Sequence, residues 1–115
     1  MPAIALTTDT SALTAIGNDF GYDQVFVRQL EALGRAGDAL IVYSTSGNSG
    51  NIIAAIAQAK SMGVQTIALT GDSGGKIKNL VDACLCMPSA ETPRIQEAHA
   101  FVGHALCDLI DRQFT

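Results

Sequence analysis

The sequence has no tryptophan, few charged side chains and no cluster of basic residues. Aromatic residues make up 5% of the 115 residues and charged residues 16%, and the formal net charge is −4. Because phosphate backbones are bound through basic patches, the composition argues against a nucleic-acid partner. So little charge also leaves an apolar surface, which in a folded protein usually marks an interface. We therefore expect copies of the chain to associate.

The chain also lacks a long apolar run and a basic leader. No stretch approaches the roughly 20 apolar residues that span a bilayer, and residues 1–6 have no basic segment of a signal peptide. The cysteines Cys84, Cys86 and Cys107 are odd in number and have no CxxC spacing, which favours reduced thiols over a disulfide framework. These absences predict a cytoplasmic location and no membrane partner.

Short β-branched runs alternate with helical stretches along the chain. The patterns predict strands at residues 4–6, 38–43, 65–69 and 83–87, and helices at 10–16, 23–34, 49–62, 76–80 and 92–112. Residues 38–43 are almost entirely apolar, which is typical of a strand buried on both faces. The alternation predicts one α/β domain over residues 1–115, a three-layer α-β-α doubly wound parallel sheet.

The most informative segment follows the strand predicted at 38–43. Four hydroxyl residues fall within six positions there, namely Ser44, Thr45, Ser46 and Ser49. In open α/β sheets, ligands bind beyond the carboxyl ends of the strands, and a helix that begins there offers unpaired N–H groups to phosphate. The loop is neither a Walker A loop nor a dinucleotide fingerprint, and it has no lysine. We interpret it as a site for one phosphate on a small metabolite; the alternative is an ordinary serine-rich helix cap.

A second polar loop, Thr70–Gly75, follows the next predicted strand. Its three glycines and its serine favour a tight turn over a ligand site.

Four separated motifs resemble the phosphoheptose isomerase family of sugar isomerase (SIS) domains. They are Ser44–Ser49, Leu69–Gly71, Thr14–Asp19 with Gly21–Asp23, and Arg94–His99 with His104. The resemblance implies a flavodoxin-like SIS fold. It also implies aldose–ketose isomerisation of sedoheptulose 7-phosphate to D-glycero-D-manno-heptose 7-phosphate, a lipopolysaccharide heptose precursor. One zinc ion per subunit and a homotetramer are further implications of the resemblance.

The same resemblance implies roles for individual residues. Hydroxyls of the loop contact the substrate phosphate and nearby oxygens, and an Asn-Asp pair contacts the substrate. A glutamine on the last helix binds both metal and substrate, and a histidine on that helix binds metal and moves a proton. At the matching positions these are Ser44, Thr45, Ser46, Ser49, Asn18, Asp19, Gln96 and His104. The family pattern does not include His99, which we expect to be structural.

The sequence departs from the family at its beginning. The family has a strand and a Gly-Asn-Gly-Gly-Ser loop before the segment that matches residues 2–6, and then a helix bearing a histidine and a glutamate. The resemblance therefore implies a chain without that first strand and the N-terminal helices, and with an incomplete metal site. Isomerisation needs both a general acid and a general base, and His104 is the one credible candidate, since imidazole titrates near neutral pH. We expect no measurable turnover and no tight zinc binding from these residues alone.

Two other functions stay open at this point. The first is a non-catalytic SIS module, either a sugar-phosphate sensor or an adaptor that binds a replication initiator. The second is a fragment without activity of its own. Adaptor relatives keep the Arg94–Glu97 motif but tend to lose a histidine at the position of His104, so its presence favours the isomerase.

Overall fold

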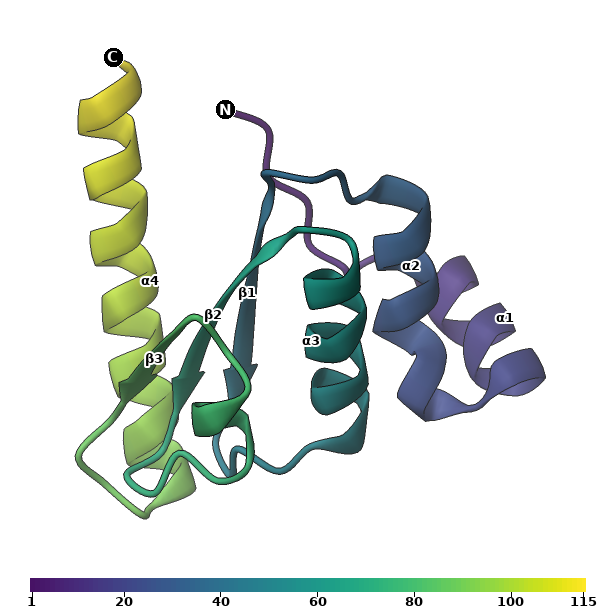
Figure 1. Cartoon of the computed structure of the whole chain (residues 1–115). Helices are drawn as coiled ribbons and strands as arrows, with labels where there is room; N and C mark the ends of the chain where they lie inside the picture. Colours follow the sequence, from purple (N-terminus) through teal and green to yellow (C-terminus); the bar gives the residue numbers. More distant parts are fainter.

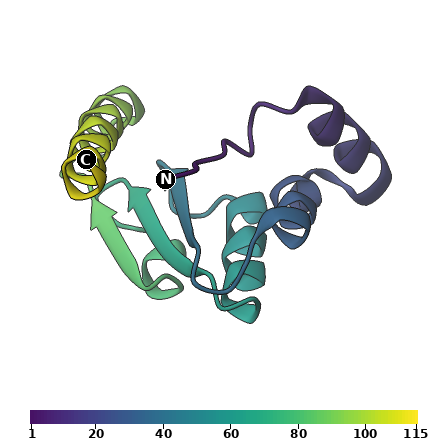
Figure 2. The same cartoon turned by 90° about the horizontal axis from the view of Figure 1, so that it is seen from above.

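The computed structural model describes residues 1–115 and places a parallel sheet between two helical layers (Figures 1 and 2). Strands β1 (Ala39–Ser44), β2 (Gln65–Thr70) and β3 (Ala83–Cys86) lie in the order β1-β2-β3. Helix α3 (Gly50–Ser61) and the short helix η2 (Ile77–Asn79) cover one face, and α4 (Thr92–Phe114) crosses the other. The α/β class with helices on both faces is thereby confirmed.

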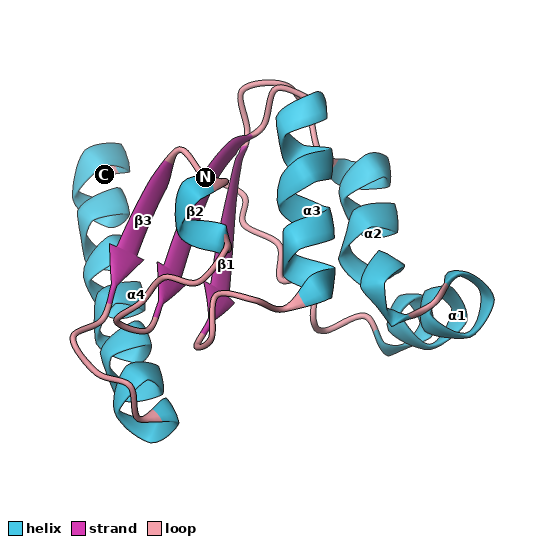
Figure 3. Cartoon of the chain, turned by 60° about the horizontal axis from the view of Figure 1, so that its bottom comes forward, coloured by secondary structure: helices cyan, strands magenta, loops and turns pink.

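The remaining helices extend the layer that contains α3. Helix α1 (Thr10–Phe20) leads through η1 (Tyr22–Gln24) into α2 (Val25–Leu33), and α2 packs beside α3 (Figure 3). The Asp9 side chain accepts the Ala12 N–H at 2.9 Å and caps α1. Gly63, at φ 72°, follows the end of α3 and allows the Val64 N–H to reach back to the Ala59 carbonyl oxygen at 2.9 Å.

The core lies between the sheet and α3. Val42 of β1 and Ala68 of β2 pack with Ile56 of α3 and Ile77 of η2. A second cluster joins Leu30 of α2 to Ala59 and Val64. Small and β-branched side chains bring α3 close to the sheet, and this contact fixes where the loop between β1 and α3 lies.

The strand predicted at residues 4–6 is wrong. Residues 1–5 have no regular structure, and the Leu6 carbonyl oxygen accepts a hydrogen bond from Gln29 Nε2 of α2 at 2.9 Å. The segment pairs with no strand of the sheet. A three-residue apolar run has no strand geometry of its own without a neighbour that supplies hydrogen bonds.

The prediction that residues 38–43 are buried on both faces is also wrong. Ile41 and Tyr43 are 38% and 48% exposed, whereas Val42 and Ser44 of the same strand are buried. The reason is that β1 is an edge strand, which α3 covers on one face while α4 packs over β2 on the other.

Helix α4 is only partly covered. Its buried residues, Ile95 and His99, both lie in its first two turns. Phe101, Leu109 and Phe114 further along are more than 60% exposed, and the end of the helix rises past the sheet (Figure 1). None of the helices combines the length and the apolar character that spanning a bilayer requires.

Candidate functional site

The loop from Ser44 to Ser49 turns tightly at the carboxyl end of β1. The Gly47 N–H donates to both the carbonyl oxygen and Oγ of Ser44, each at 3.2 Å. Ser44 Oγ lies 3.0 Å from Ser49 Oγ, so the two ends of the loop contact each other. The Asn48 N–H donates to Ser46 Oγ at 3.1 Å. The loop is thus held by its own hydroxyl groups, and Ser44 is buried beneath it.

Backbone N–H groups without hydrogen-bond partners lie where this loop leads into α3. The N–H groups of Gly50 and Asn51 make no hydrogen bond within the chain, and no side-chain hydrogen bond caps the helix. First-turn N–H groups carry the positive end of the helix dipole. The Thr45 hydroxyl also has no partner in the chain. Free amides beside hydroxyls suit an anion with several oxygens, as a phosphate has.

The second loop, Thr70–Gly75, packs against the backbone of the first loop. The Gly71 N–H donates to the Thr45 carbonyl oxygen at 3.0 Å. A Cβ at Gly75 would lie 2.5 Å from the carbonyl oxygens of both Ser46 and Gly47, and one at Gly47 would overlap the Gly74 carbonyl group. Only glycine allows this backbone contact. The loop is a turn, closed by the Gly74 N–H on the Gly71 carbonyl oxygen at 3.2 Å, as predicted.

Two further hydrogen bonds tie the loops together. The Ile77 N–H donates to the Gly47 carbonyl oxygen, and the Lys76 N–H donates to Asn48 Oδ1, both at 3.0 Å. Asn48 was not among the residues predicted to form the site. The paired glycines at 74 and 75 were the available signal, because side-by-side glycines after a strand indicate close backbone approach.

Helix α4 begins beside these loops. The Ile95 side chain packs against Gly71, where a Cβ would lie 2.7 Å from Ile95 Cδ1. One turn on, His99 is 6% exposed, its Nε2 lies 3.1 Å from the Thr70 carbonyl oxygen, and its ring meets Tyr43 edge-on at 5.6 Å. This burial agrees with a structural role for His99, which stays a prediction.

His104 lies further along α4 at an open depression of about 460 Å³. The depression is lined by Tyr43, His99, Ala100, Gly103, His104 and Cys107. Tyr43 lies on β1 one residue before Ser44, where the candidate phosphate loop begins. Tyr43 was not among the residues predicted to form the site.

The metal ligands implied by the resemblance do not form a complete site. Gln96 and His104 are both exposed on α4, and no group of three His, Cys, Asp or Glu side chains is placed to hold an ion. A tetrahedral zinc site needs three or four protein ligands. The side chains of this chain therefore do not fit a zinc ion by themselves.

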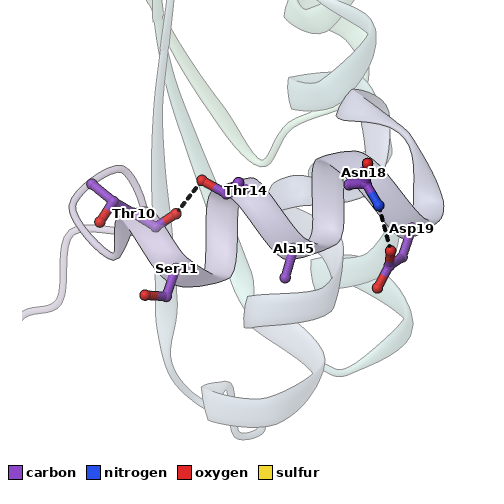
Figure 4. Close-up of a pocket in the computed structure, with 6 residues that line it drawn as sticks. All are labelled: Thr10, Ser11, Thr14, Ala15, Asn18 and Asp19. Carbon is purple, nitrogen blue, oxygen red and sulfur yellow. Dashed lines mark hydrogen bonds between the residues drawn. The ribbon is translucent and has the colours of Figure 1, made fainter.

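Asn18 and Asp19 lie apart from the phosphate loop. They contact each other, with Asn18 Nδ2 donating to Asp19 Oδ1 at 2.8 Å (Figure 4). They line an open depression of about 590 Å³ whose wall comes from α1 alone. The structure thus shows three separate parts of the predicted site, on α1, on the β1–α3 loop and on α4.

The side chains with shifted pKa values lie on the opposite edge of the sheet. The Thr66 N–H and hydroxyl donate to Asp82 Oδ2 at 2.7 and 2.8 Å, and these hydrogen bonds lower the pKa of that carboxyl. Burial raises the pKa of the Cys84 thiol. Neither group belongs to the candidate phosphate site.

Comparisons with known proteins agree with this arrangement. The family model for the SIS domain matches residues 1–71. The phosphoheptose isomerase of Sulfurimonas denitrificans is 57% identical over 98% of this chain and 58% of its own length. That of Aliarcobacter butzleri is 57% identical over 100% of this chain and 61% of its own length.

Solved structures give the same result. A phosphoheptose isomerase from Francisella tularensis superposes with a TM-score of 0.94 at 46% identity, over 96% of this chain and 62% of that one. The enzyme from Neisseria gonorrhoeae gives 0.93 at 56% identity, over 96% and 61%. The chain spans about three fifths of the length of these relatives. With the family model matched over more than half of its residues, and with the loop and layers described above, the chain belongs to the SIS domain family.

Proposed function

We propose that the loop Ser44–Ser49 binds the phosphate of a sugar phosphate. The observation that carries this proposal is the set of free donors in one short segment: the amides of Gly50 and Asn51 at the start of α3 and the Thr45 hydroxyl have no partner within the chain. The loop has no lysine, and it therefore suits a ligand with one phosphate group rather than a triphosphate. Ser46 and Ser49 supply further hydroxyls at the same point.

The protein to which this chain belongs is proposed to be a phosphoheptose isomerase acting on sedoheptulose 7-phosphate. The reaction moves a proton between neighbouring carbons of the sugar through an enediol. His104 is the proposed proton carrier, since a neutral imidazole accepts a proton and its conjugate acid returns it. Asn18, Asp19 and Gln96 are proposed to contact the substrate. The sequence identity of 55–57% to phosphoheptose isomerases over nearly the whole chain supports the assignment.

Zinc, a homotetramer and a cytoplasmic location are proposed for that protein from the family resemblance. Gln96 and His104 would supply two zinc ligands, and the others would have to come from outside these residues or from another copy of the chain. We assign no step of the reaction to the ion. The exposed apolar side chains of α4, together with Ile41 and Tyr43 on the sheet, support association of copies.

Phosphate binding is tested with a pair of serine variants on the same helix. Ser49→Ala removes a hydroxyl at the start of α3, and Ser61→Ala removes one at its end, where Ser61 Oγ donates to Gln58. Amide shifts are followed by NMR as inorganic phosphate or sedoheptulose 7-phosphate is added. Ser49→Ala should weaken binding by about 1–3 kcal/mol, as for one charge-assisted hydrogen bond, and Ser61→Ala should not. Shifts confined to another strand end would contradict the proposal.

The catalytic proposal needs a separate assay. The chain of 115 residues holds one credible proton carrier, so we expect no measurable turnover of sedoheptulose 7-phosphate, with or without added zinc. A longer protein that carries this chain and the family's other acid/base residues should turn it over. Robust turnover by residues 1–115 would show that both proton carriers lie within them.

The adaptor alternative makes a different prediction. A non-catalytic module would bind a protein partner while its sugar-phosphate loop had no catalytic role. The intact hydroxyl loop and His104 favour the isomerase, and so do the relatives, which are named phosphoheptose isomerases.

A further inference from the structure

Two cysteines of β3 bring their sulfur atoms together. Cys84 Sγ lies 3.8 Å from Cys86 Sγ, because side chains two residues apart on a strand point to the same face. Thr70 Oγ1, at the end of β2, lies 3.7 Å from the Cys84 sulfur and 3.5 Å from the Cys86 sulfur. Both cysteines are only partly buried, and the strand that carries them is an edge strand of this chain. The proposed sugar-phosphate chemistry uses neither.

The strand does not allow these two sulfurs to form a disulfide. The Cα atoms of residues i and i+2 lie roughly 6.6 Å apart along a strand, and their Cα–Cβ bonds are nearly parallel, so the Cβ atoms stay about as far apart. A disulfide needs Cβ atoms about 3.5–4.5 Å apart. Closing the bond between Cys84 and Cys86 would therefore bend β3 out of its ladder with β2.

A single atom between the sulfurs fits without any such change. Two bonds of about 2.3 Å that meet at a tetrahedral centre place their sulfurs roughly 3.8 Å apart. That spacing is the one observed between the two thiols. We propose that Cys84 and Cys86 form a bidentate site for one thiophilic centre, a soft divalent cation or a trivalent arsenical. The soft character of sulfur ligands selects this class over magnesium or calcium.

The reaction with an arsenical is a condensation without oxidation or reduction. Phenylarsine oxide forms one As–S bond to each sulfur, and the arsenic-bound oxygen leaves as water with the two thiol protons. A cation likewise displaces both protons. Because burial raises the pKa of the Cys84 thiol, a cation must displace the proton of that thiol near neutral pH, and cation affinity should increase as the pH is raised.

The experiment uses the reduced chain at low micromolar concentration with one equivalent of phenylarsine oxide. Intact mass should show one adduct that has lost one water, stable to excess monothiol and released by dimercaptopropanol. Cys84→Ser and Cys86→Ser should each lose the monothiol-resistant adduct. Cys107→Ser is the matched control, since Cys107 lies alone and exposed on α4, and it should keep the adduct.

A second measurement tests cation binding, and a third checks that each variant is folded. Added Cd²⁺ should give ultraviolet thiolate-to-metal absorption with the natural chain and with Cys107→Ser, and not with Cys84→Ser. Far-ultraviolet circular dichroism checks that each variant is folded. If Cys86→Ser is not folded, Cys86→Ala replaces it in the experiment. Release of the arsenical by monothiol from the natural chain, or loss of capture in Cys107→Ser alone, would overturn the proposal.

Discussion

The imidazole Nε2 of His99 lies 3.1 Å from the carbonyl oxygen of Thr70, which joins α4 to the end of β2. A carbonyl oxygen only accepts, so Nε2 carries the hydrogen. Thr70 is fully buried, and its carbonyl oxygen also accepts the Met87 N–H of the next strand end at 3.0 Å. The contact thus fixes the position of α4 over the sheet beside the candidate phosphate loop.

His99→Leu should therefore lower the free energy of unfolding by about 0.5–1.5 kcal/mol, the net contribution of one hydrogen bond, because the Thr70 carbonyl oxygen keeps the Met87 N–H as a donor. Urea unfolding followed by circular dichroism measures this. His104→Leu is the control, because His104 is an exposed histidine of the same helix, and its effect should stay within about 0.5 kcal/mol. Equal losses in both variants would contradict the role assigned to His99.

Gly47→Ala should destabilise the chain more than Gly37→Ala. Both glycines have positive φ, 66° and 91°, so each alanine pays about 1–2 kcal/mol for left-handed backbone. Only the Cβ at position 47 meets backbone, since nothing lies within 4 Å of one at position 37. Thermal unfolding of the two variants gives the comparison. Similar melting temperatures would mean that the two loops do not pack as described.

Asp82 should make the stability depend on pH in the acid range. Hydrogen bonds from Thr66 lower the folded-state pKa of this carboxyl below its ordinary value of 3.8. Its contribution is therefore present above that value and is lost as the pH falls through the folded pKa. Asp82→Asn should be less stable than the natural chain at neutral pH, and the difference should shrink below pH 3.8.

Urea unfolding at a series of pH values tests this prediction. Asp111→Asn is the control, because the Asp111 carboxylate makes no hydrogen bond within the chain and should leave the profile unchanged. A constant difference between Asp82→Asn and the natural chain across the acid range would contradict the role of the Thr66 contacts.

Cys107 should react with iodoacetamide before Cys84. The thiolate is the reactive form, burial raises the pKa of the Cys84 thiol, and Cys107 is exposed. Peptide mass mapping over a time course at neutral pH gives the order of modification. Faster labelling of Cys84 would mean that its sulfur is more ionised than its surroundings imply.

The sequence predicts the parts of this fold that have local causes. The apolar run before Ser44 predicts β1, and the helices predicted at 10–16 and 92–112 begin at the residues where α1 and α4 begin. The exposure of Ile41 and Tyr43 had no local signal, because it depends on which strand lies at the edge and which strand α4 crosses. An apolar run looks the same in a central strand and in an edge strand.

The candidate site likewise has parts that the sequence predicts and parts that it does not. Hydroxyls within one short loop were recognisable because the loop and the helix start are adjacent in sequence. The support of that loop by residues 70–75 was not, since it depends on contacts between two strand ends. The roles of Asn18, Asp19, Gln96 and His104 came from resemblance alone, and they stay predictions.

The close backbone packing of Gly47 against Gly74 and Gly75 has a consequence for engineering. A library that randomises residues 44–49 and leaves 70–75 fixed would yield only loops that can pack against the present 70–75 loop. Transplanting the first loop into another α/β scaffold without the second would leave it unsupported. The two segments act as one structural unit, and a chimaera that combines the first loop with a second loop lacking Gly74 or Gly75 should fold poorly.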